Sequence, residues 1–319
     1  RIGKTNPIFP KARRYPPLTF SATSLAGPRT RPAAFIHNQS TARSVWADVM
    51  LSPDENSADA DHVYFHIWGG EDIHIGLYES DDEPIAEASR RTVRRMAELA
   101  GDLGPVTEVL DLGAGYGGSM RYLAQRFGCR CVAPNLSEVE NERGRAMNRE
   151  AGLSDRIEVV DGDCSSLAYR DETFDLVWPQ DALLHSGDRA QVCREAARVL
   201  RPGGRLVFTD PMQADDVPVE GLQPILDRLH LRSLGSPGFY RETLGGLGLV
   251  ERVFDDRADQ LPRHYDRVRR ALLDNAATLR ERGVSEEYIE RMQAGLQHWI
   301  DGGKRGDLAW GIFVFVRPS

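Results

Sequence analysis

The stretch Val109-Leu-Asp-Leu-Gly-Ala-Gly-Tyr-Gly-Gly118 decides the fold of this chain. An apolar segment ends in an acid, and glycines follow at once at positions 113, 115, 117 and 118. A helical apolar spacing then begins, carried by Met120, Leu123, Ala124 and Phe127. Glycines let the backbone turn tightly and let a ligand lie against bare main chain. The stretch therefore predicts a strand, a ligand-binding turn and a helix.

The glycines alone fit two kinds of ligand. Written as Gly113-x-Gly115-x-x-Gly118, they match the dinucleotide fingerprint. Asp111 favours a different ligand, because a carboxylate so close to the turn would repel a pyrophosphate but would attract an ammonium. S-adenosylmethionine (AdoMet) carries an ammonium and a sulfonium and no phosphate. We therefore expect AdoMet rather than a nicotinamide cofactor at this turn.

The end of the next predicted strand supports that choice. A nicotinamide enzyme usually carries Asp or Glu about 20 residues past the glycines, where it binds the ribose. Here the strand over 129–133 ends at Pro134-Asn135. The neutral amide of Asn135 can still donate to and accept from ribose hydroxyls.

Strands and helices alternate along most of the chain. Apolar runs predict strands at 106–111, 129–133, 157–161, 173–178, 204–209 and 249–254, with helices between most of them. The final run, 310–316, predicts a strand that enters antiparallel. The pattern predicts an α/β fold with a mostly parallel, Rossmann-like sheet covered on both faces.

The chain divides into unequal parts. Residues 1–47 carry eight of the 40 Lys and Arg residues and no acid, so we expect a disordered or targeting extension. Residues 48–83 are expected to form a lid segment, dense in aromatic and His side chains. Residues 84–319 are expected to form the main domain. Within it, helices over about 262–304 should cap the carboxyl edge of the sheet, where ligands bind in such folds.

Composition narrows the partners and the compartment. Beyond residue 47 the chain has 32 basic and 48 acidic residues, which argues against nucleic acid because phosphate binding needs a basic face. No apolar run approaches the roughly 18 residues of a membrane span. The four cysteines show no zinc spacing, so no metal is expected. We expect a cytoplasmic protein, or an organellar one if residues 1–47 are a transit peptide. The choice between monomer and dimer stays open.

Five further stretches resemble one enzyme family. They are Ile67-Trp-Gly-Gly-Glu-Asp-Ile-His-Ile-Gly-Leu-Tyr78, Gln180-Asp-Ala-Leu-Leu-His-Ser186, Phe208-Thr-Asp-Pro-Met212, Leu234-Gly-Ser-Pro-Gly-Phe-Tyr-Arg241 and Leu296-Gln-His-Trp-Ile-Asp-Gly-Gly303. With the glycine turn, they resemble the sarcosine/dimethylglycine N-methyltransferases of glycine betaine synthesis, which are class I AdoMet-dependent methyltransferases. The class I likeness covers roughly residues 85–318 and none of 1–47. It implies methylation of sarcosine to dimethylglycine, and of dimethylglycine to the osmoprotectant glycine betaine.

The resemblance also implies a cofactor site at the ends of the strands. Asp111 and the glycines should lie along the methionine part of AdoMet, and Gln180 beside the reacting methyl. Residues after the second strand should hold the ribose and adenine, and those after the third strand the adenine amino group and ring. The full expected set is Tyr64, Trp68, Asp111, Gly113, Gly115, Asn135, Leu136, Glu140, Asp163, Cys164 and Gln180.

The expected chemistry is in-line displacement, in which an amine lone pair attacks the sulfonium methyl at about 3–3.5 Å. A tertiary amine must lose its proton before it attacks, because the quaternary product has none to lose. His185 is the expected general base or relay. Asp181 is expected to orient His185 or to offset the charge of the product, with Gln180 beside them.

Substrate contacts are expected from three kinds of group. Aromatic faces suit a methylammonium, and Trp68, Tyr64, Phe239 and Tyr240 are candidates for a partial cage. A carboxylate needs a cationic or amide partner, for which the candidates are Arg241, Gln180 and His74. Pro211 and Met212 could form an apolar wall that favours N-methylated amines.

Three alternatives stay open at this point. The first is a class I methyltransferase of another small acceptor, such as phosphoethanolamine or a phenolic ring. A phosphorylated substrate would need clustered Arg or Lys, and none is concentrated near 178–186 or 208–216. The second is a dinucleotide-dependent oxidoreductase, and the third is an AdoMet-binding protein without catalysis.

Overall fold

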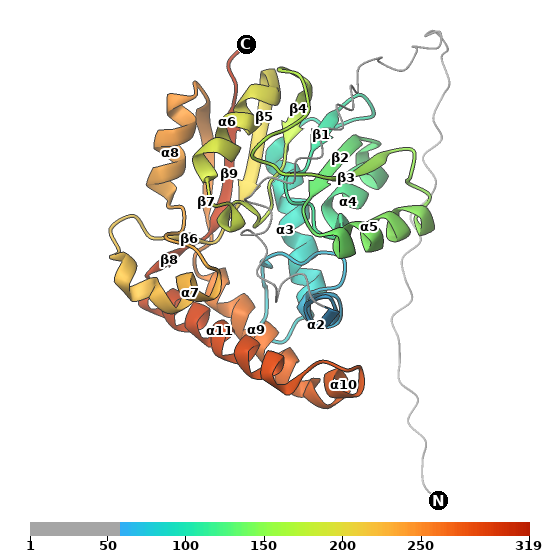
Figure 1. Ribbon diagram of the computed structural model, residues 1–319. Coiled ribbons are helices and arrows are strands. Elements are labelled where there is room, and N and C mark those ends of the chain that lie inside the picture. The colour runs from blue at the N-terminus through green and yellow to red at the C-terminus, as the bar shows by residue number, and fades with distance from the viewer. Residues whose placement is uncertain (1–57) are drawn as a thin grey trace, which may run out of the picture. The chain divides into compact units, whose positions relative to one another are not determined.

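The structure, a computed structural model, describes residues 58–319. The expectations for residues 1–47, and for the first part of the segment 48–83, lie outside the described residues. The main feature is a seven-stranded sheet of order β3-β2-β1-β4-β5-β9-β7 (Figure 1). Its strands are, in chain order, β1 (Glu108–Leu110), β2 (Arg130–Asn135), β3 (Ile157–Asp161), β4 (Phe174–Val177), β5 (Leu200–Thr209), β7 (Val250–Asp256) and β9 (Gly311–Val316).

The strand predictions are confirmed in place and in direction. Strand β9 runs antiparallel to both β5 and β7, whereas the pairs among β1 to β5 are parallel. Strand β5 begins at residue 200 rather than 204. The pairing of β4 with β5 shifts register between Phe174 and Leu176, which pair with Leu200 and Arg205, so residues 201–204 form an irregularity within β5.

Successive residues of each central strand enter opposite cores, as the two-residue period of a strand requires. One core combines α3 (Ile85–Ala100) and α4 (Gly118–Phe127) with Val109, Cys131, Leu176, Val207 and Val314. The other combines α6 (Arg189–Val199) and α8 (Pro237–Gly246) with Leu110, Val132, Val177, Leu206 and Phe313. Helix α5 (Glu138–Glu150) packs beside β3. The sheet is therefore covered on both faces, as predicted.

A third core lies under a helical cap at one end of the sheet (Figure 1). The cap contains η3 (Val219–Leu222), α7 (Gln223–Arg228), α9 (Gln260–Asp274), α10 (Ala276–Glu281) and α11 (Glu286–Arg305). The last three match the helical segment expected over about 262–304. A short two-stranded sheet, β6 (Met212–Gln213) with β8 (Leu308–Ala309), was not predicted from the sequence.

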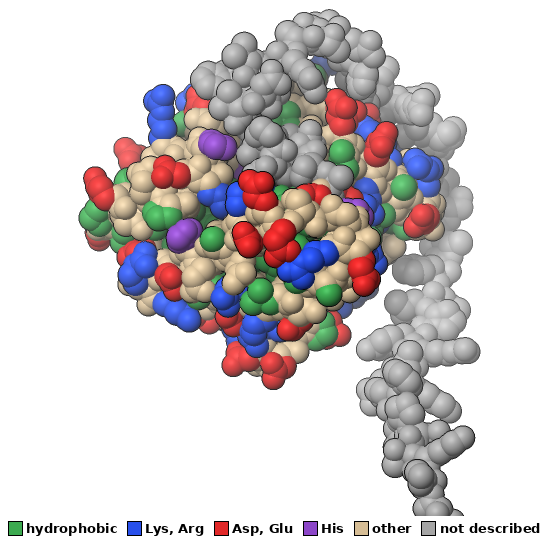
Figure 2. All heavy atoms as spheres, turned by 60° about the horizontal axis from the view of Figure 1, so that its bottom comes forward, with side chains coloured by type: hydrophobic (Ala, Val, Ile, Leu, Met, Phe, Trp, Pro, Cys, Tyr) green, Lys and Arg blue, Asp and Glu red, His purple; other side chains and the backbone are tan. Residues whose placement is uncertain are grey.

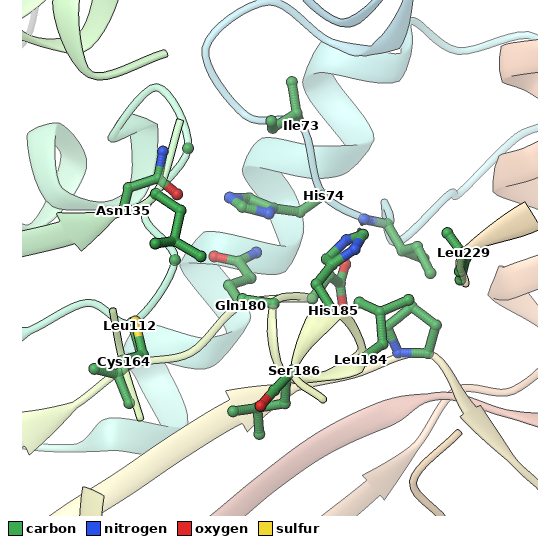
Figure 3. A pocket seen from close by; sticks show the side chains of 18 of the residues that line it. Ile73, His74, Leu112, Asn135, Cys164, Gln180, Leu184, His185, Ser186 and Leu229 are labelled. Atoms are coloured by element: carbon green, nitrogen blue, oxygen red, sulfur yellow. Dashed lines mark hydrogen bonds between the residues drawn. The ribbon is translucent and has the colours of Figure 1, made fainter. Parts of the chain in front are cut away.

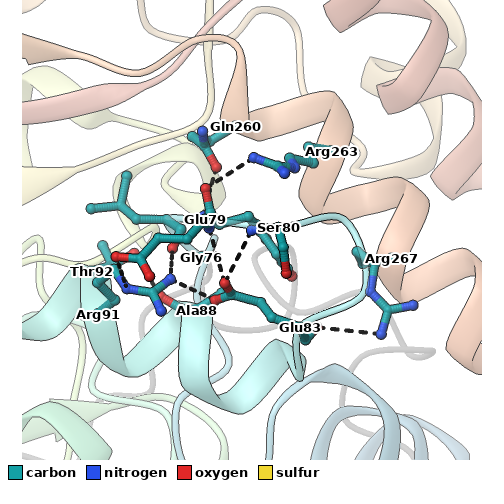
Figure 4. A network of polar contacts seen from close by, with 12 residues as sticks. Gly76, Glu79, Ser80, Glu83, Ala88, Arg91, Thr92, Gln260, Arg263 and Arg267 are labelled. Atoms are coloured by element: carbon teal, nitrogen blue, oxygen red, sulfur yellow. Dashed lines mark hydrogen bonds and ion pairs between the residues drawn. The ribbon is translucent and has the colours of Figure 1, made fainter.

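The N-terminal segment begins as a helix and ends extended. Helix α2 (Ala58–Val63) continues into a π-helix, η1 (Tyr64–Trp68). Gly69 ends it with a φ of 157°. Residues 69–84 then cross the cap, where Glu83 accepts from the amides of Glu79 and Ser80 and pairs with Arg91 at 2.5 Å (Figure 4).

Helix α9 holds the same segment from the other side. The amide of Tyr78 donates to Oε1 of Gln260 at 2.7 Å, and its carbonyl accepts from Arg263 at 2.9 Å. These contacts fasten the N-terminal segment to both α3 and α9 and fix its course past the carboxyl end of the sheet (Figure 4).

The face shown in Figure 2 carries acidic and basic side chains interspersed, with isolated hydrophobic ones between them. No side of this face presents a broad field of one charge. Over residues 58–319, no helix is both long enough and apolar enough to cross a membrane.

Gly118 controls the docking of the N-terminal segment. A methyl group there would overlap Oδ1 of Asp72 and the carbonyl oxygen of Glu71. Overpacking of this kind costs about 1–3 kcal/mol. We therefore expect Gly118→Ala to lower the free energy of unfolding by about that amount and to increase amide hydrogen exchange over residues 70–78.

Gly245→Ala is the matched control, because nothing lies within 4 Å of a Cβ at this position of α8. It should raise the stability by up to about 1 kcal/mol, the helix-propensity difference between glycine and alanine. If Gly118→Ala and Gly245→Ala changed the free energy of unfolding and the hydrogen exchange equally, residues 71–72 would not pack against α4.

Candidate active site

A cavity lies at the carboxyl ends of the central strands. Its wall comes from the loops after β1 to β5, from the N-terminal segment and from α7, α9 and α11. The sequence had marked fourteen of its residues: Tyr64, Trp68, His74, Gly113, Gly115, Asn135, Leu136, Glu140, Asp163, Cys164, Gln180, Asp181, His185 and Pro211. The fold therefore brings together most of the predicted site.

The glycine turn forms the floor of the cavity between β1 and α4. Gly113 has a φ of 77°, and its amide donates to the carbonyl of Pro134 at 3.0 Å. A methyl group at Gly113 would lie 2.7 Å from the Cβ of Ala182. Glycine is required here both by the backbone angle and by the close approach of the next loop.

Asp111 lies beneath this turn, buried, and is not itself part of the cavity wall. Within the described residues, its Oδ1 has no hydrogen-bond partner. Burial raises the pKa of this carboxyl well above its usual range. A buried acceptor without a partner carries a desolvation cost. A ligand that brings an ammonium to the turn would remove that cost, so the residue fits the AdoMet expectation.

The end of β2 offers paired polar groups. Nδ2 of Asn135 donates to Oε2 of Glu140 at 2.9 Å, and Ser137 caps α5 by accepting from the amide of Glu140. The cap fixes the first turn of α5, so Glu140 stays beside Asn135. Both side chains line the cavity with Leu136, which gives hydroxyl-binding groups next to an apolar side chain.

The loop after β3 contributes Asp163 and Cys164 to the wall. Oδ1 of Asp163 accepts from the amide of Ser165 at 2.7 Å, which orders the loop. Burial raises the pKa of the Cys164 thiol to about 12. The thiol therefore stays protonated near neutral pH and cannot act as a nucleophile.

Gln180 follows β4 with its amide oriented by two donors. Its Oε1 accepts from the Ser119 hydroxyl at 2.6 Å and from the Trp178 indole at 3.1 Å. This leaves Nε2 as a buried donor without a partner among the described residues, in a side chain that lines the cavity. Such a donor is available to a ligand oxygen.

Asp181 holds two distant segments together. Its Oδ2 accepts from the amide of Ile75 at 2.8 Å, and its Oδ1 accepts from the Trp310 indole at 2.8 Å. Burial raises the pKa of the carboxyl, whereas these hydrogen bonds act in the opposite direction. Both oxygens are therefore occupied by structural donors.

Two histidines line the same cavity in different environments. Burial lowers the pKa of His74 to about 3, so its ring is neutral near neutral pH. His185 ends a short 3-10 helix, η2 (Leu183–His185), and is exposed. In Figure 3 the His74 ring lies above the Gln180 amide and the His185 ring lies to its right. His185 is the one of this pair that can exchange protons with solvent.

Cap residues that the sequence did not single out complete an aromatic wall. Tyr265 of α9 and Trp299 of α11 line the cavity and stack at 5.0 Å between ring centroids. Trp68 meets Tyr265 edge-on at 5.9 Å and Tyr64 at 5.3 Å. Trp299 belongs to the stretch 296–303 that resembles the family, but no site role was expected for it. Arg228, at the end of α7, also lines the cavity and had no sequence signal.

Three residues predicted to contact the substrate, Met212, Tyr240 and Arg241, do not line the cavity, so these predictions are wrong in position. Met212 is fully buried in the core beneath α8. Tyr240 is also fully buried and donates its hydroxyl to Oδ2 of Asp210 at 2.7 Å. Arg241 pairs with Glu251 at 2.8 Å. Phe239, a candidate for the cage, packs beside Tyr240 in the same layer.

For Tyr240 and Arg241, the physical reason is the direction of α8. This helix covers one face of the sheet, so its side chains enter the core or the solvent rather than the strand ends. Pro211, which precedes the helix in the loop after β5, does line the cavity.

Comparison with known proteins places the chain in a family. The methyltransferase domain family matches residues 110–208. A sarcosine/dimethylglycine N-methyltransferase from Halorhodospira halochloris is 60% identical, over 82% of this chain and 93% of the relative. Another from Aphanothece halophytica is 49% identical, over 82% and 95%.

A solved structure agrees with these relatives. A protein from Galdieria sulphuraria, proposed to be a sarcosine dimethylglycine methyltransferase, has 42% identity and a TM-score of 0.77 over 82% of this chain and 98% of that one. The chain therefore belongs to the sarcosine/dimethylglycine N-methyltransferase family of AdoMet-dependent methyltransferases.

Proposed function

We propose that this chain methylates the amine of sarcosine and then that of dimethylglycine, which gives glycine betaine. One observation carries the proposal: the aromatic wall of Tyr64, Trp68, Tyr265 and Trp299 lines the same cavity as the glycine turn. Aromatic faces attract methylated ammonium groups. The cavity therefore suits a cationic methyl donor at one end and an amine that gains positive charge at the other.

The residues at the strand ends would hold AdoMet. When bound, it supplies a methyl group on a positively charged sulfur. Asp111 would accept from its ammonium, and Asn135 with Glu140 would hold its ribose hydroxyls. Asp163 would accept from the adenine amino group, and Nε2 of Gln180 would donate to an oxygen near the reacting end. The unpartnered atoms of Asp111 and Gln180 support this assignment.

His185 would take the proton from the substrate ammonium. Its ring lines the cavity and is exposed, so the proton can leave to solvent. Asp181 is unsuited to this role because the amide of Ile75 and the indole of Trp310 occupy its two oxygens. His74 is a weak base, since burial keeps its pKa low. His185 is thus the imidazole of this pair that borders the cavity and is also exposed to solvent.

The cap has a second role in this proposal, which is to limit water. Trp299 and Tyr265 are almost fully buried although they line the cavity. Water excluded from the reacting end cannot compete with the amine or screen the charges there. The substrate would thus react against aromatic rings and oriented polar groups instead of bulk solvent.

The alternatives have less support. Among the described residues that line the cavity, Arg228 is the single Arg or Lys, and a phosphorylated amine would need more positive charge. The acidic excess of the chain beyond residue 47 likewise disfavours nucleic acid as a partner. Family membership removes the basis for a dinucleotide-dependent oxidoreductase.

A transfer assay tests the function directly. Purified protein with methyl-labelled AdoMet should label sarcosine and dimethylglycine, and the labelled products should be dimethylglycine and glycine betaine. Glycine and phosphoethanolamine are offered in parallel under the same conditions. Label that appears on phosphoethanolamine alone would refute the proposed substrate class.

His185→Gln tests the assignment of the proton acceptor. We expect kcat for dimethylglycine to fall about 100-fold or more at neutral pH, because a positioned general base contributes that much. The deficit should narrow as the pH rises, since more of the free substrate is then already unprotonated. The Kd for AdoMet should stay within about twofold of the wild-type value.

His298→Gln is the matched control, because His298 is exposed on α11 and does not line the cavity. It should leave both constants unchanged. If His185→Gln weakened AdoMet binding as strongly as it lowered kcat, the residue would belong to the cofactor site.

A further inference from the structure

Arg228 is an unusual cation for this protein. It ends α7, is half-buried and lines the cavity. Arginines elsewhere in the cap form ion pairs, such as Arg280 with Glu286 and Arg305 with Asp307. Within residues 58–319, no carboxylate pairs with Arg228. Its one hydrogen bond there is from Nη2 to the sulfur of Met292 at 3.1 Å.

A thioether sulfur is a weak acceptor, so this contact does not satisfy a guanidinium with five N–H donors. An arginine held at a cavity wall without an anionic partner has donors and charge available to a ligand. The planar group suits a carboxylate, which it can hold with two parallel hydrogen bonds.

A glycine of α11 makes room for this guanidinium. Gly295 lies in the buried interior of α11, where a Cβ would overlap Nη1 of Arg228 and lie 2.7 Å from its Cδ. Glycine in the middle of a helix costs about 1 kcal/mol relative to alanine. Here the missing side chain lets the arginine lie directly against the helix backbone.

Arg228 belongs to the cap side of the cavity wall, since it ends α7 and directly precedes Leu229. In Figure 3, its neighbour Leu229 lies on the opposite side of the cavity from Asn135, with Gln180 and His185 between them. Tyr265 and Trp299, from the adjacent cap helices, line the same region. The cavity thus has hydroxyl-binding groups at one side and an arginine with aromatic rings at the other.

We infer that Arg228 binds the carboxylate of the amino-acid substrate and so selects amino acids over amino alcohols. The inference rests on the proposed function and adds a residue to it. An N-methylated amino acid has a carboxylate and a methylated amine a short distance apart. Arg228 takes the first and the aromatic wall takes the second, which turns the amine toward Gln180 and His185.

Arg228→Gln tests this role against a matched pair of substrates, dimethylglycine and N,N-dimethylethanolamine. The second carries a hydroxymethyl group in place of the carboxylate. Hydrogen bonds to charged groups correspond to about a 10- to 100-fold change in affinity. The wild-type preference for dimethylglycine, as the ratio of kcat/KM values, should therefore fall about 10- to 100-fold. Arg228→Lys should recover part of the loss.

The control variant is Arg232→Gln, which removes an exposed arginine four residues along that does not line the cavity. Its substrate preference should equal that of the wild type. The Kd for AdoMet should be unchanged in all these variants, because the arginine lies away from the cofactor residues. An unchanged ratio in Arg228→Gln would overturn the inference.

Gly295→Ala supplies an independent test that keeps the charge. The added methyl should displace the guanidinium and raise KM for dimethylglycine, although alanine favours the helix. In the Arg228→Gln background, the same change should have little further effect on KM, since the group it displaces is absent. If the increases in KM from Gly295→Ala and Arg228→Gln simply added, the cap would be damaged in general. That result would contradict the role of Arg228 as the carboxylate anchor.

Failure of the anchor and failure of the proposed function give different results. A wild-type protein that labels no N-methylated amino acid refutes the function and the anchor together. A wild-type protein that methylates dimethylglycine, with the same substrate preference in Arg228→Gln, refutes the anchor alone. Binding of glycine betaine in the presence of S-adenosylhomocysteine, followed by tryptophan fluorescence, gives a readout without turnover. It should weaken about 10- to 100-fold in Arg228→Gln.

Discussion

The two hydrogen bonds accepted by the half-buried carboxylate of Asp181 are the constraint on which the cavity depends. One oxygen accepts from the amide of Ile75 in the N-terminal segment, and the other accepts from the indole of Trp310, immediately before β9. Asp181 itself follows β4 and has a φ of 51°. One side chain therefore connects the end of the sheet, the N-terminal segment and the C-terminal strand. This junction positions the cavity walls that contain His74, Gln180 and His185.

The charges around this junction are arranged for a cationic reaction. Buried acids lie beneath the cavity: Asp111 has an unpartnered oxygen, and burial raises the pKa of Asp210 to about 7. The cavity wall adds the carboxyl groups of Glu140, Asp163 and Asp181, and Arg228 is the one Arg or Lys among the described lining residues. A sulfonium donor and an amine that becomes an ammonium both gain from such surroundings. A dianionic phosphate would not, which agrees with the acidic composition of the body of the chain.

The sequence predicted which strand-end residues line the cavity better than which cap residues do, for a physical reason. Residues such as Asn135, Asp163 and Gln180 directly follow strands, and the carboxyl ends of parallel strands meet at one edge, so strand order alone brings them together. Tyr265, Trp299 and Arg228 come from cap helices, where apolar spacing shows which side is buried but not which residue borders a cavity. Arg241 was the arginine expected at the substrate carboxylate because it lies in a stretch that resembles the family, whereas Arg228 lies in none of those stretches. The packing of α8 on the sheet, which sequence patterns do not reveal, directs Arg241 to the surface.

The most direct test of this account is amide hydrogen exchange at Ile75 in Asp181→Asn. Asparagine keeps the shape but offers one acceptor oxygen, so one of two buried donors loses its partner, at a cost of about 1–3 kcal/mol. Protection of the Ile75 amide or of the Trp310 indole should fall about 10- to 100-fold, with weaker binding of both AdoMet and dimethylglycine. Unchanged protection at both sites, together with an altered pH profile of kcat, would contradict the account. It would show that Asp181 acts as a titrating group and not as the junction of the cavity walls.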